Sequence, residues 1–261
     1  MKSIVLRPME LGDQEMVMKW RTLPEVTRYM KTDSTGDLTQ QKQWFLKQKQ
    51  KNDCYYWIIE VEGKAIGVTS ITEIDKEKGT CTRGTYIAEK IDHSFEIITT
   101  IYANQHDFVF EQLGLNRIVI HIFCDNRFVV KLNKMCGFCE KCILKQRICK
   151  KGKKYDIVEL ELTRDEWREK KSKWHYDHID IITGSDEMDK LEEIIKKWYP
   201  GYDKTVNMKL FSEGLLDSVV FVAIISDIEE VFGVEIPIEL VNPENFDTIE
   251  NMSEVVERLR G

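Results

Sequence analysis

The sequence predicts two domains: an α+β domain with a mostly antiparallel sheet, and after it a small all-α domain of four helices. Three observations predict this organisation. Strand and helix patterns are mixed through the first two thirds of the chain, which is typical of an α+β fold. A strongly apolar helix is expected near residue 220. Residues 186–261 hold 18 acidic and 7 basic residues, whereas the rest of the chain has a net charge of +4.

The elements of the first domain are expected in the following order. Strand patterns occupy residues 4–7, 55–61, 65–72, 80–88, 117–123, 140–147 and 155–162. Helical patterns occupy residues 13–21, 39–51, 97–113, 126–135 and 165–173, with one more helical turn at Pro24. Gly63 supplies a hairpin turn, and Gly114 and Gly137 end two helices. We expect a domain over 1–168, a linker over 169–186 and a domain over 187–261.

The second domain is organised around a helix over residues 218–232. Asp217 is a good N-cap residue, Ser218 takes the first helical position, and Gly233 ends the helix. The run from residue 219 is apolar on almost every side, which predicts a helix buried in a small bundle. The Ser218 hydroxyl lies at the positive end of this helix, where free N–H groups and the helix dipole attract phosphate. A plain solvent-facing serine beside a cap is the simpler alternative.

Composition narrows the classes of function. The longest uninterrupted apolar run covers residues 219–225, and a membrane-spanning helix needs about 20 residues. The first residues lack the apolar core of a signal peptide, so we expect a cytoplasmic protein. The acidic second domain argues against nucleic acid as the main partner and favours docking on the more basic first domain. Acidity that only keeps a small domain soluble is the alternative.

The seven cysteines are expected to be reduced thiols. Cys136, Cys139 and Cys142 have a spacing similar to an iron–sulfur motif, but the fourth cysteine and its following proline are missing. We therefore expect no metal.

Residues 186–261 resemble the acyl and peptidyl carrier proteins. The similarity lies in Asp217-Ser218-Val219, in the Glu-Ile-Pro of residues 235–237, and in the final helix expected from about residue 251. The resemblance implies that Ser218, beside Asp217, carries 4′-phosphopantetheine, whose thiol holds an acyl group as a thioester. It also implies two partners, a phosphopantetheinyl transferase and an enzyme that loads the acyl group.

Residues 3–168 resemble the GNAT N-acyltransferases, in the branch that acetylates ribosomal proteins and amino sugars. The similar segments are residues 6–8, 20–30, 62–67, 110–115, 125–126 and 136–138. Residues 72–75 and 152–156 add a closer likeness to the N-acetyltransferases of the pseudaminic-acid pathway, which act on a nucleotide-linked amino sugar. The chain is therefore expected to acylate an amine.

The resemblance also implies a site. The pantetheine arm of the donor enters between the strands expected at 80–88 and 117–123. A backbone N–H near residues 86–88, with Ala88 as the candidate, faces the thioester oxygen, and Asn126 bonds the arm. The amine acceptor is expected at Arg21, Tyr29, Met30 and Trp44. Asn133 stands where many relatives have the tyrosine that protonates the leaving thiolate. Three other candidates for that proton donor are Tyr86, His121 and Cys124, and two candidates for the base are Glu73 and Glu89.

The sequence departs from the family where a glycine-rich turn normally binds the pyrophosphate of CoA. Residues 91–96 contain no glycine and contain Asp92 and Glu96, whose charges repel phosphate. We expect that the donor is the chain's own carrier, which needs no pyrophosphate site; acyl-CoA bound at an unusual loop is an alternative. A third hypothesis is a catalytically degenerate domain that docks a carrier serving other enzymes. Arg127, Lys131 and Lys134 form a basic face that either docks the carrier or is merely solvated.

Overall fold

The computed structural model describes residues 2–32, 36–203 and 208–260. The chain divides into two compact units, Met1–Ile182 and Thr183–Gly261. No helix in the described ranges is long and apolar enough to cross a membrane.

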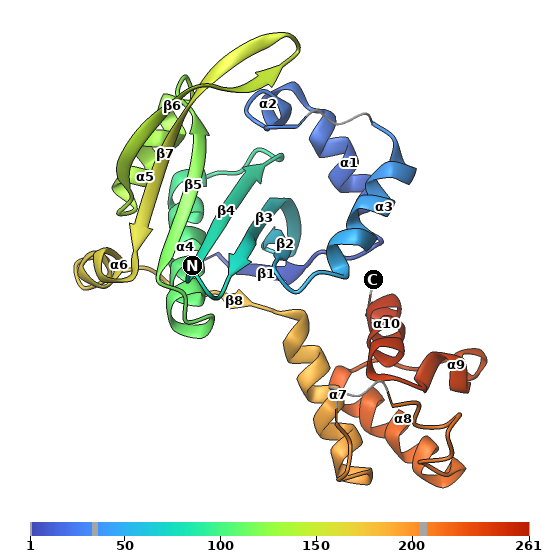
Figure 1. Cartoon of the computed structure of the whole chain (residues 1–261). Coiled ribbons are helices and arrows are strands. Elements are labelled where there is room, and N and C mark those ends of the chain that lie inside the picture. Colours follow the sequence, from blue (N-terminus) through green and yellow to red (C-terminus); the bar gives the residue numbers. More distant parts are fainter. Residues whose placement is uncertain (1, 33–35, 204–207, 261) are drawn as a thin grey trace. The chain divides into compact units, whose positions relative to one another are not determined.

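The first unit is built on one sheet (Figure 1). Its strands are β1 (Ile4–Pro8), β2 (Tyr55–Val61), β3 (Lys64–Asp75), β4 (Thr80–Ile87), β5 (Arg117–Phe123), β6 (Cys139–Lys150), β7 (Lys153–Thr163) and β8 (Asp180–Ile181). Their order across the sheet is β6-β7-β5-β4-β3-β2-β1-β8. Only the β4–β5 and β1–β8 pairs are parallel, so the prediction of a mostly antiparallel sheet is confirmed.

Helices cover both faces of this sheet because successive side chains of a strand point to opposite faces. Trp57 of β2 belongs to the larger core, under the face that carries α4 (Ser94–Asp107) and α5 (Arg127–Met135). The next residue, Ile58, belongs to a smaller core under α1 (Gln14–Thr22) and α3 (Leu38–Lys49). The remaining helical segments are α2 (Pro24–Thr27), the π-helical turn η1 (Phe108–Gln112) that continues α4, and α6 (Arg164–Lys171).

β4 and β5 separate soon after they begin. They are paired only at Thr80 with Arg117 and at Cys81 with Ile118. Figure 1 shows the two strands diverging toward their carboxyl ends. The chain continues from these ends into α4 and α5, so both helices begin beside the opening between the strands.

The segment expected as a linker belongs largely to the first unit, which corrects the expected end of that unit at 168. Trp174 and Tyr176 pack against the main core, and β8 pairs with β1. Trp57 Nε1 donates to the carbonyl of Ile182 over 2.7 Å. Only Thr183 separates Ile182 from helix α7, which begins at Gly184.

The second unit contains α7 (Gly184–Trp198), α8 (Ser218–Phe232), the short 3₁₀ turn η2 (Ile238–Leu240), α9 (Pro243–Phe246) and α10 (Ile249–Arg260). One core joins them, and Ile224, Ile228 and Phe232 are the buried side of α8. The expectation that α8 is buried on all sides was wrong. Val219 is 78% exposed and Val222 is 64% exposed, because the small bundle covers only one side of this helix.

Candidate functional site

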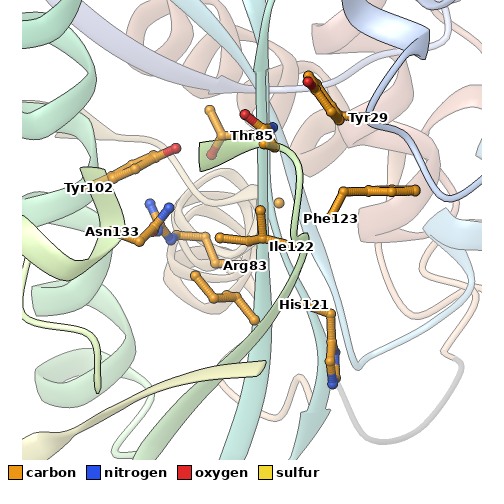
Figure 2. Close-up of a pocket in the computed structure, with 11 residues that line it drawn as sticks. Tyr29, Arg83, Thr85, Tyr102, His121, Ile122, Phe123 and Asn133 are labelled. Carbon is orange, nitrogen blue, oxygen red and sulfur yellow. The ribbon is translucent and has the colours of Figure 1, made fainter. Parts of the chain in front are cut away.

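A cavity of about 130 Å³ lies where β4 and β5 separate. Side chains from both strands and from α4, α5 and the segment after α2 line it: Tyr29, Arg83, Gly84, Thr85, Tyr102, Ile120, His121, Ile122, Phe123, Asn126 and Asn133. Figure 2 shows Arg83, Tyr102 and Asn133 on one side of the cavity and Tyr29 and Phe123 on the other. The cavity thus brings together the predicted residues Tyr29, Asn126 and Asn133.

Arg83 is the most unusual residue of the cavity, and no pattern in the sequence predicted its burial. It is only 7% exposed. Its Nη2 donates to Asn133 Oδ1, while Nε and Nη1 have no hydrogen-bond partner among the described residues. The guanidinium carbon lies 3.4 Å from the centroid of the Tyr102 ring. Burial lowers the pKa of the guanidinium, yet arginine stays charged in proteins. Each unpartnered buried donor costs about 1–3 kcal/mol.

Asn126 faces the same cavity from the start of α5. It occupies the N-cap position, but its side chain makes no capping hydrogen bond. The side chain of Asn126 therefore does not cap this helix. Its amide lines the cavity and can bond the amide groups of an extended arm.

The predicted role of Ala88 needs a correction. The Ala88 N–H donates to the carbonyl of Ile66 over 2.8 Å, so it is not available to a thioester oxygen. Hydrogen-bonding directions alternate along an antiparallel strand. The N–H groups of Thr85 and Ile87 are accordingly the ones that point from β4 toward the opening, and Thr85 lines the cavity.

The first turn of α4 has the acidic character that the sequence indicated. His93 takes the N-cap position in the left-handed conformation, with φ of 61°, and makes no side-chain cap. Glu96 lies in the first turn, where a carboxylate complements the positive end of the helix. Its nearest oxygen is 3.9 Å from His93 Nδ1. The negative charge of Glu96 in this turn therefore disfavours the binding of a phosphate there.

Of the predicted acceptor residues, Arg21 lies on α1 and Trp44 on α3, whereas Tyr29 lies in the cavity between β4 and β5, against Phe123. Arg21 Nη1 donates to Gln41 Oε1, its guanidinium lies 5.8 Å from the ring centroid of Trp44, and its Nε has no hydrogen-bond partner among the described residues. The Tyr86 hydroxyl is buried, likewise with no partner in the described ranges, and burial raises its pKa while the charge of Arg21 opposes the rise. Met30 contributes by its backbone, because its carbonyl accepts a hydrogen bond from Lys150 Nζ in the β6–β7 hairpin.

The two candidate bases differ in their surroundings. Glu89 Oε1 accepts a hydrogen bond from the indole of the buried Trp20, an arrangement that fixes α1 to the sheet. Glu73 is exposed, has φ of 54°, and accepts a hydrogen bond from Thr82 Oγ1. His121 Nε2 lies 3.0 Å from Glu159 Oε2 across the β5–β7 pair. His121 lines the cavity, whereas neither Glu73 nor Glu89 does.

Ser218 is exposed at the first position of α8. Asp217 caps this helix, with Oδ1 accepting from the N–H groups of Val219 and Val220, each over 2.9 Å. The cap occupies those two N–H groups without covering the Ser218 hydroxyl. An exposed hydroxyl at a helix start fits covalent attachment of a phosphodiester group.

Sequence reasoning missed Asp247, which holds the loop before Ser218. Its carboxylate is buried and accepts hydrogen bonds from the backbone N–H groups of Phe211 and Ser212 and from the Ser212 hydroxyl. Burial alone would raise the pKa of this carboxyl, but the hydrogen bonds from Ser212 and Phe211 outweigh it and hold the pKa below its usual value.

We expect Asp247→Asn to destabilise the second unit by about 2 kcal/mol, because a charged acceptor of several bonds is lost. The contribution of the wild-type carboxylate is complete above its unfolded pKa, about 3.9, and is lost as the pH falls through the lower folded value. Hydrogen exchange of α8 and α10 at neutral pH measures the change. Glu254→Gln, at an exposed position of α10, is the matched control. Equal protection in both variants would contradict this role.

Two other predictions concern a basic face on α5 and the presence of a metal site. Arg127, Lys131 and Lys134 are exposed on α5, and Lys134 pairs with Glu140. Phe128, on the same helix, is 66% exposed. Within the described ranges, no group of three or more His, Cys, Asp or Glu side chains has an arrangement that could hold a metal ion.

The splayed sheet and the helical bundle define an acyltransferase fold joined to a carrier domain. The family described as acetyltransferase (GNAT) domain matches residues 3–139, just over half of the chain, and the chain belongs to this family. The family described as phosphopantetheine attachment site matches residues 191–256. The protein is thus an N-acyltransferase with a C-terminal carrier domain, which implies a covalent phosphopantetheine and a phosphopantetheinyl transferase that attaches it.

Individual relatives agree with the family. The chain is 26% identical to acetyltransferase PseH of Campylobacter jejuni over 125 residues, which are 47% of this chain and 76% of that protein. It is 24% identical to the uncharacterized N-acetyltransferase p20 of Bacillus licheniformis, over 64% of this chain and 96% of that protein. The spermidine N-acetyltransferase of Vibrio cholerae, solved with CoA and spermine, has a TM-score of 0.60 at 19% identity, over 64% of this chain and 98% of that one. This last likeness concerns the fold alone.

Proposed function

We propose that the chain transfers an acyl group from a phosphopantetheine thioester on Ser218 to a primary amine, and that the amine belongs to a nucleotide-linked amino sugar. One observation carries the proposal. The opening between β4 and β5 holds a cavity with polar groups, while the first turn of α4, where a CoA pyrophosphate would bind, carries the negative charge of Glu96. A phosphopantetheine arm on a carrier fits this arrangement, because it can enter the cavity and has no pyrophosphate that must bind at the start of α4.

The residues of the cavity suit an extended arm. Asn126 offers a free amide, and the apolar side chains of Ile120 and Ile122 form a wall that excludes water. When bound, the phosphopantetheine supplies the acyl group in activated thioester form. The N–H of Thr85 would hold the acyl oxygen, in the place predicted for Ala88. Glu73 or the His121–Glu159 pair would take the proton that the attacking amine loses.

The connection between the units is shorter than the flexible 18-residue linker expected from the sequence. Three strands separate β8 from β4 in the sheet. At about 4.8 Å per strand, the first unit therefore ends roughly 19 Å from β4. Tethering would still raise the local donor concentration into the mM range if the arm reaches the cavity of its own chain. The arm of one chain could instead deliver its acyl group to the cavity of a second copy, and the reaction would be the same.

The acceptor proposal rests on the face under α1 and α3. Trp44 and Tyr56 meet edge to face with centroids 5.2 Å apart, and Arg21 adds a charge beside them. Rings and a guanidinium suit the base and phosphates of a nucleotide. The likeness to acetyltransferase PseH, together with the amino-sugar resemblance of the sequence, supports the same class of acceptor.

We expect Trp44→Ala to raise the KM for a nucleotide-linked amino sugar about tenfold and to leave kcat nearly unchanged, because stacking contributes about 1–3 kcal/mol per base and no reacting atom is touched. Steady-state amide formation from an acyl-loaded chain measures this. A panel that adds a polyamine and a protein N-terminus tests the acceptor class. Transfer to the polyamine alone would contradict the proposed acceptor. Transfer to no amine would favour a docking domain without catalysis.

A further inference from the structure

The buried Arg83 lacks a counter-ion among the groups that surround it. None of the described residues that line its cavity is acidic. Burial raises the pKa of the neighbouring Cys81 thiol to about 12 and also raises that of Cys136, so both are neutral. The neighbouring His106 is fully buried, and burial together with the charge of Arg83 holds its pKa well below the usual range. The neighbouring Tyr102, whose ring centroid lies 3.4 Å from the guanidinium carbon, is not an acidic counter-ion either.

The position of this charge is specific. Arg83 is two residues beyond Cys81, the last residue at which β4 pairs with β5, so its side chain lies at the closed end of the opening. Asn133 holds one arm of the guanidinium by a hydrogen bond, and Asn133 in turn donates to the carbonyl of Val129 over 2.8 Å. Two donors of this residue, Nε and Nη1, have no hydrogen-bond partner in the part of the chain that the structure describes, and Arg83 lines the cavity. Figure 2 shows this group beside the cavity, with Tyr102 next to it.

We propose that Arg83 binds the terminal sulfur of the phosphopantetheine arm as a thiolate. This inference rests on the proposed function. In the transfer, the amine nitrogen forms a bond to the acyl carbon, the carbon–sulfur bond breaks, and its electron pair stays on sulfur. The proton of the amine passes to the base and then to water. A fixed positive charge therefore stabilises the sulfur anion without a proton donor, which accounts for an asparagine at position 133 and gives it a positioning role.

The test measures the acidity of the arm's thiol rather than turnover. The full chain is converted to its phosphopantetheine form, without an acyl group, and alkylated with iodoacetamide between pH 5 and 10. Peptide mass spectrometry follows alkylation of the arm and, as an internal reference, of the exposed Cys149. A thiol next to arginine titrates at least about one unit below its ordinary value near 8.5. We expect that shift in the wild type, a return to the ordinary value in Arg83→Gln, and a retained shift in Arg83→Lys.

Two results would overturn the inference: an ordinary thiol pKa in the wild type, or the same lowered pKa in Arg83→Gln. An ordinary thiol pKa in the wild type is also the result expected if the guanidinium faces the acyl oxygen instead of the sulfur. Thermal melting of the variants shows whether they are folded, and Arg83→Lys keeps the test valid if the glutamine variant is not. Normal acyl transfer with an unshifted thiol contradicts this inference alone. A lowered thiol pKa without transfer to any amine contradicts the proposed function alone.

Discussion

We expect that replacing Ser218 by alanine abolishes amide formation by the chain when no free acyl-CoA is present. The hydroxyl is the expected attachment atom, and it is exposed at a helix start whose cap leaves it uncovered. The side chain has no packing role in the bundle, so the variant keeps its fold. The measurement compares amide formed by wild-type and variant chains after identical treatment with CoA, a phosphopantetheinyl transferase and the loading enzyme, followed by removal of small molecules.

Two controls make this result specific. Ser226→Ala removes another exposed serine from the same helix and should change nothing. In the second, a chain with Arg83→Gln is loaded with an acyl group and mixed with the Ser218→Ala chain, whose cavity is intact. Amide formed in this mixture shows whether an intact cavity accepts an arm delivered by a second copy. Full activity of Ser218→Ala on its own would show that the donor is not carried at this residue.

Free acetyl-CoA is expected to be a poor donor, and removing the acidic residues near the start of α4 should improve it. Substitution of Asp92 by Gly and of Glu96 by Gln removes two negative charges, each of which affects an anion at a helix start by about 0.3–1 kcal/mol. The expected gain in kcat/KM for acetyl-CoA is roughly tenfold. Transfer from the arm should change little, since the arm carries no pyrophosphate.

The matched control for this prediction is Glu77→Gln, which removes an exposed carboxylate between β3 and β4. Equal gains in this control and in the double variant would indicate a general effect of net charge. If the wild-type chain already used acetyl-CoA as well as the loaded arm, the protein would instead be an acetyl-CoA enzyme with an unusual loop.

Local patterns allowed much of the fold to be predicted. Alternating side chains located β2 to β5, and Gly114 marked the helix end that the structure places just after η1. The segment 173–182 was mistaken for a linker because its anchors are aromatic side chains scattered among polar ones. Trp174 and Tyr176 find their partners on α6 and α4, which no local pattern reveals.

The candidate site was predictable where a residue's role is local and not where it depends on distant partners. Asp217 and Ser218 act within one helical turn, so the sequence indicated their arrangement. Arg83 reads as an ordinary polar residue in a strand, and its burial depends on Tyr102 and Asn133, 19 and 50 positions away. Asp247 was missed for the same reason, because the loop it holds lies 35 residues earlier.

The central claim is that the donor is the chain's own carrier, and a single-turnover measurement tests it most directly. The chain is loaded with an acyl group, freed of CoA and acyl-CoA, and mixed with a nucleotide-linked amino sugar, while intact mass follows the protein. We expect that the acyl mass leaves the chain and reappears as one equivalent of amide, with the phosphopantetheine mass still attached. An acyl mass that stays on the chain, while added acetyl-CoA supports amide formation, would contradict it.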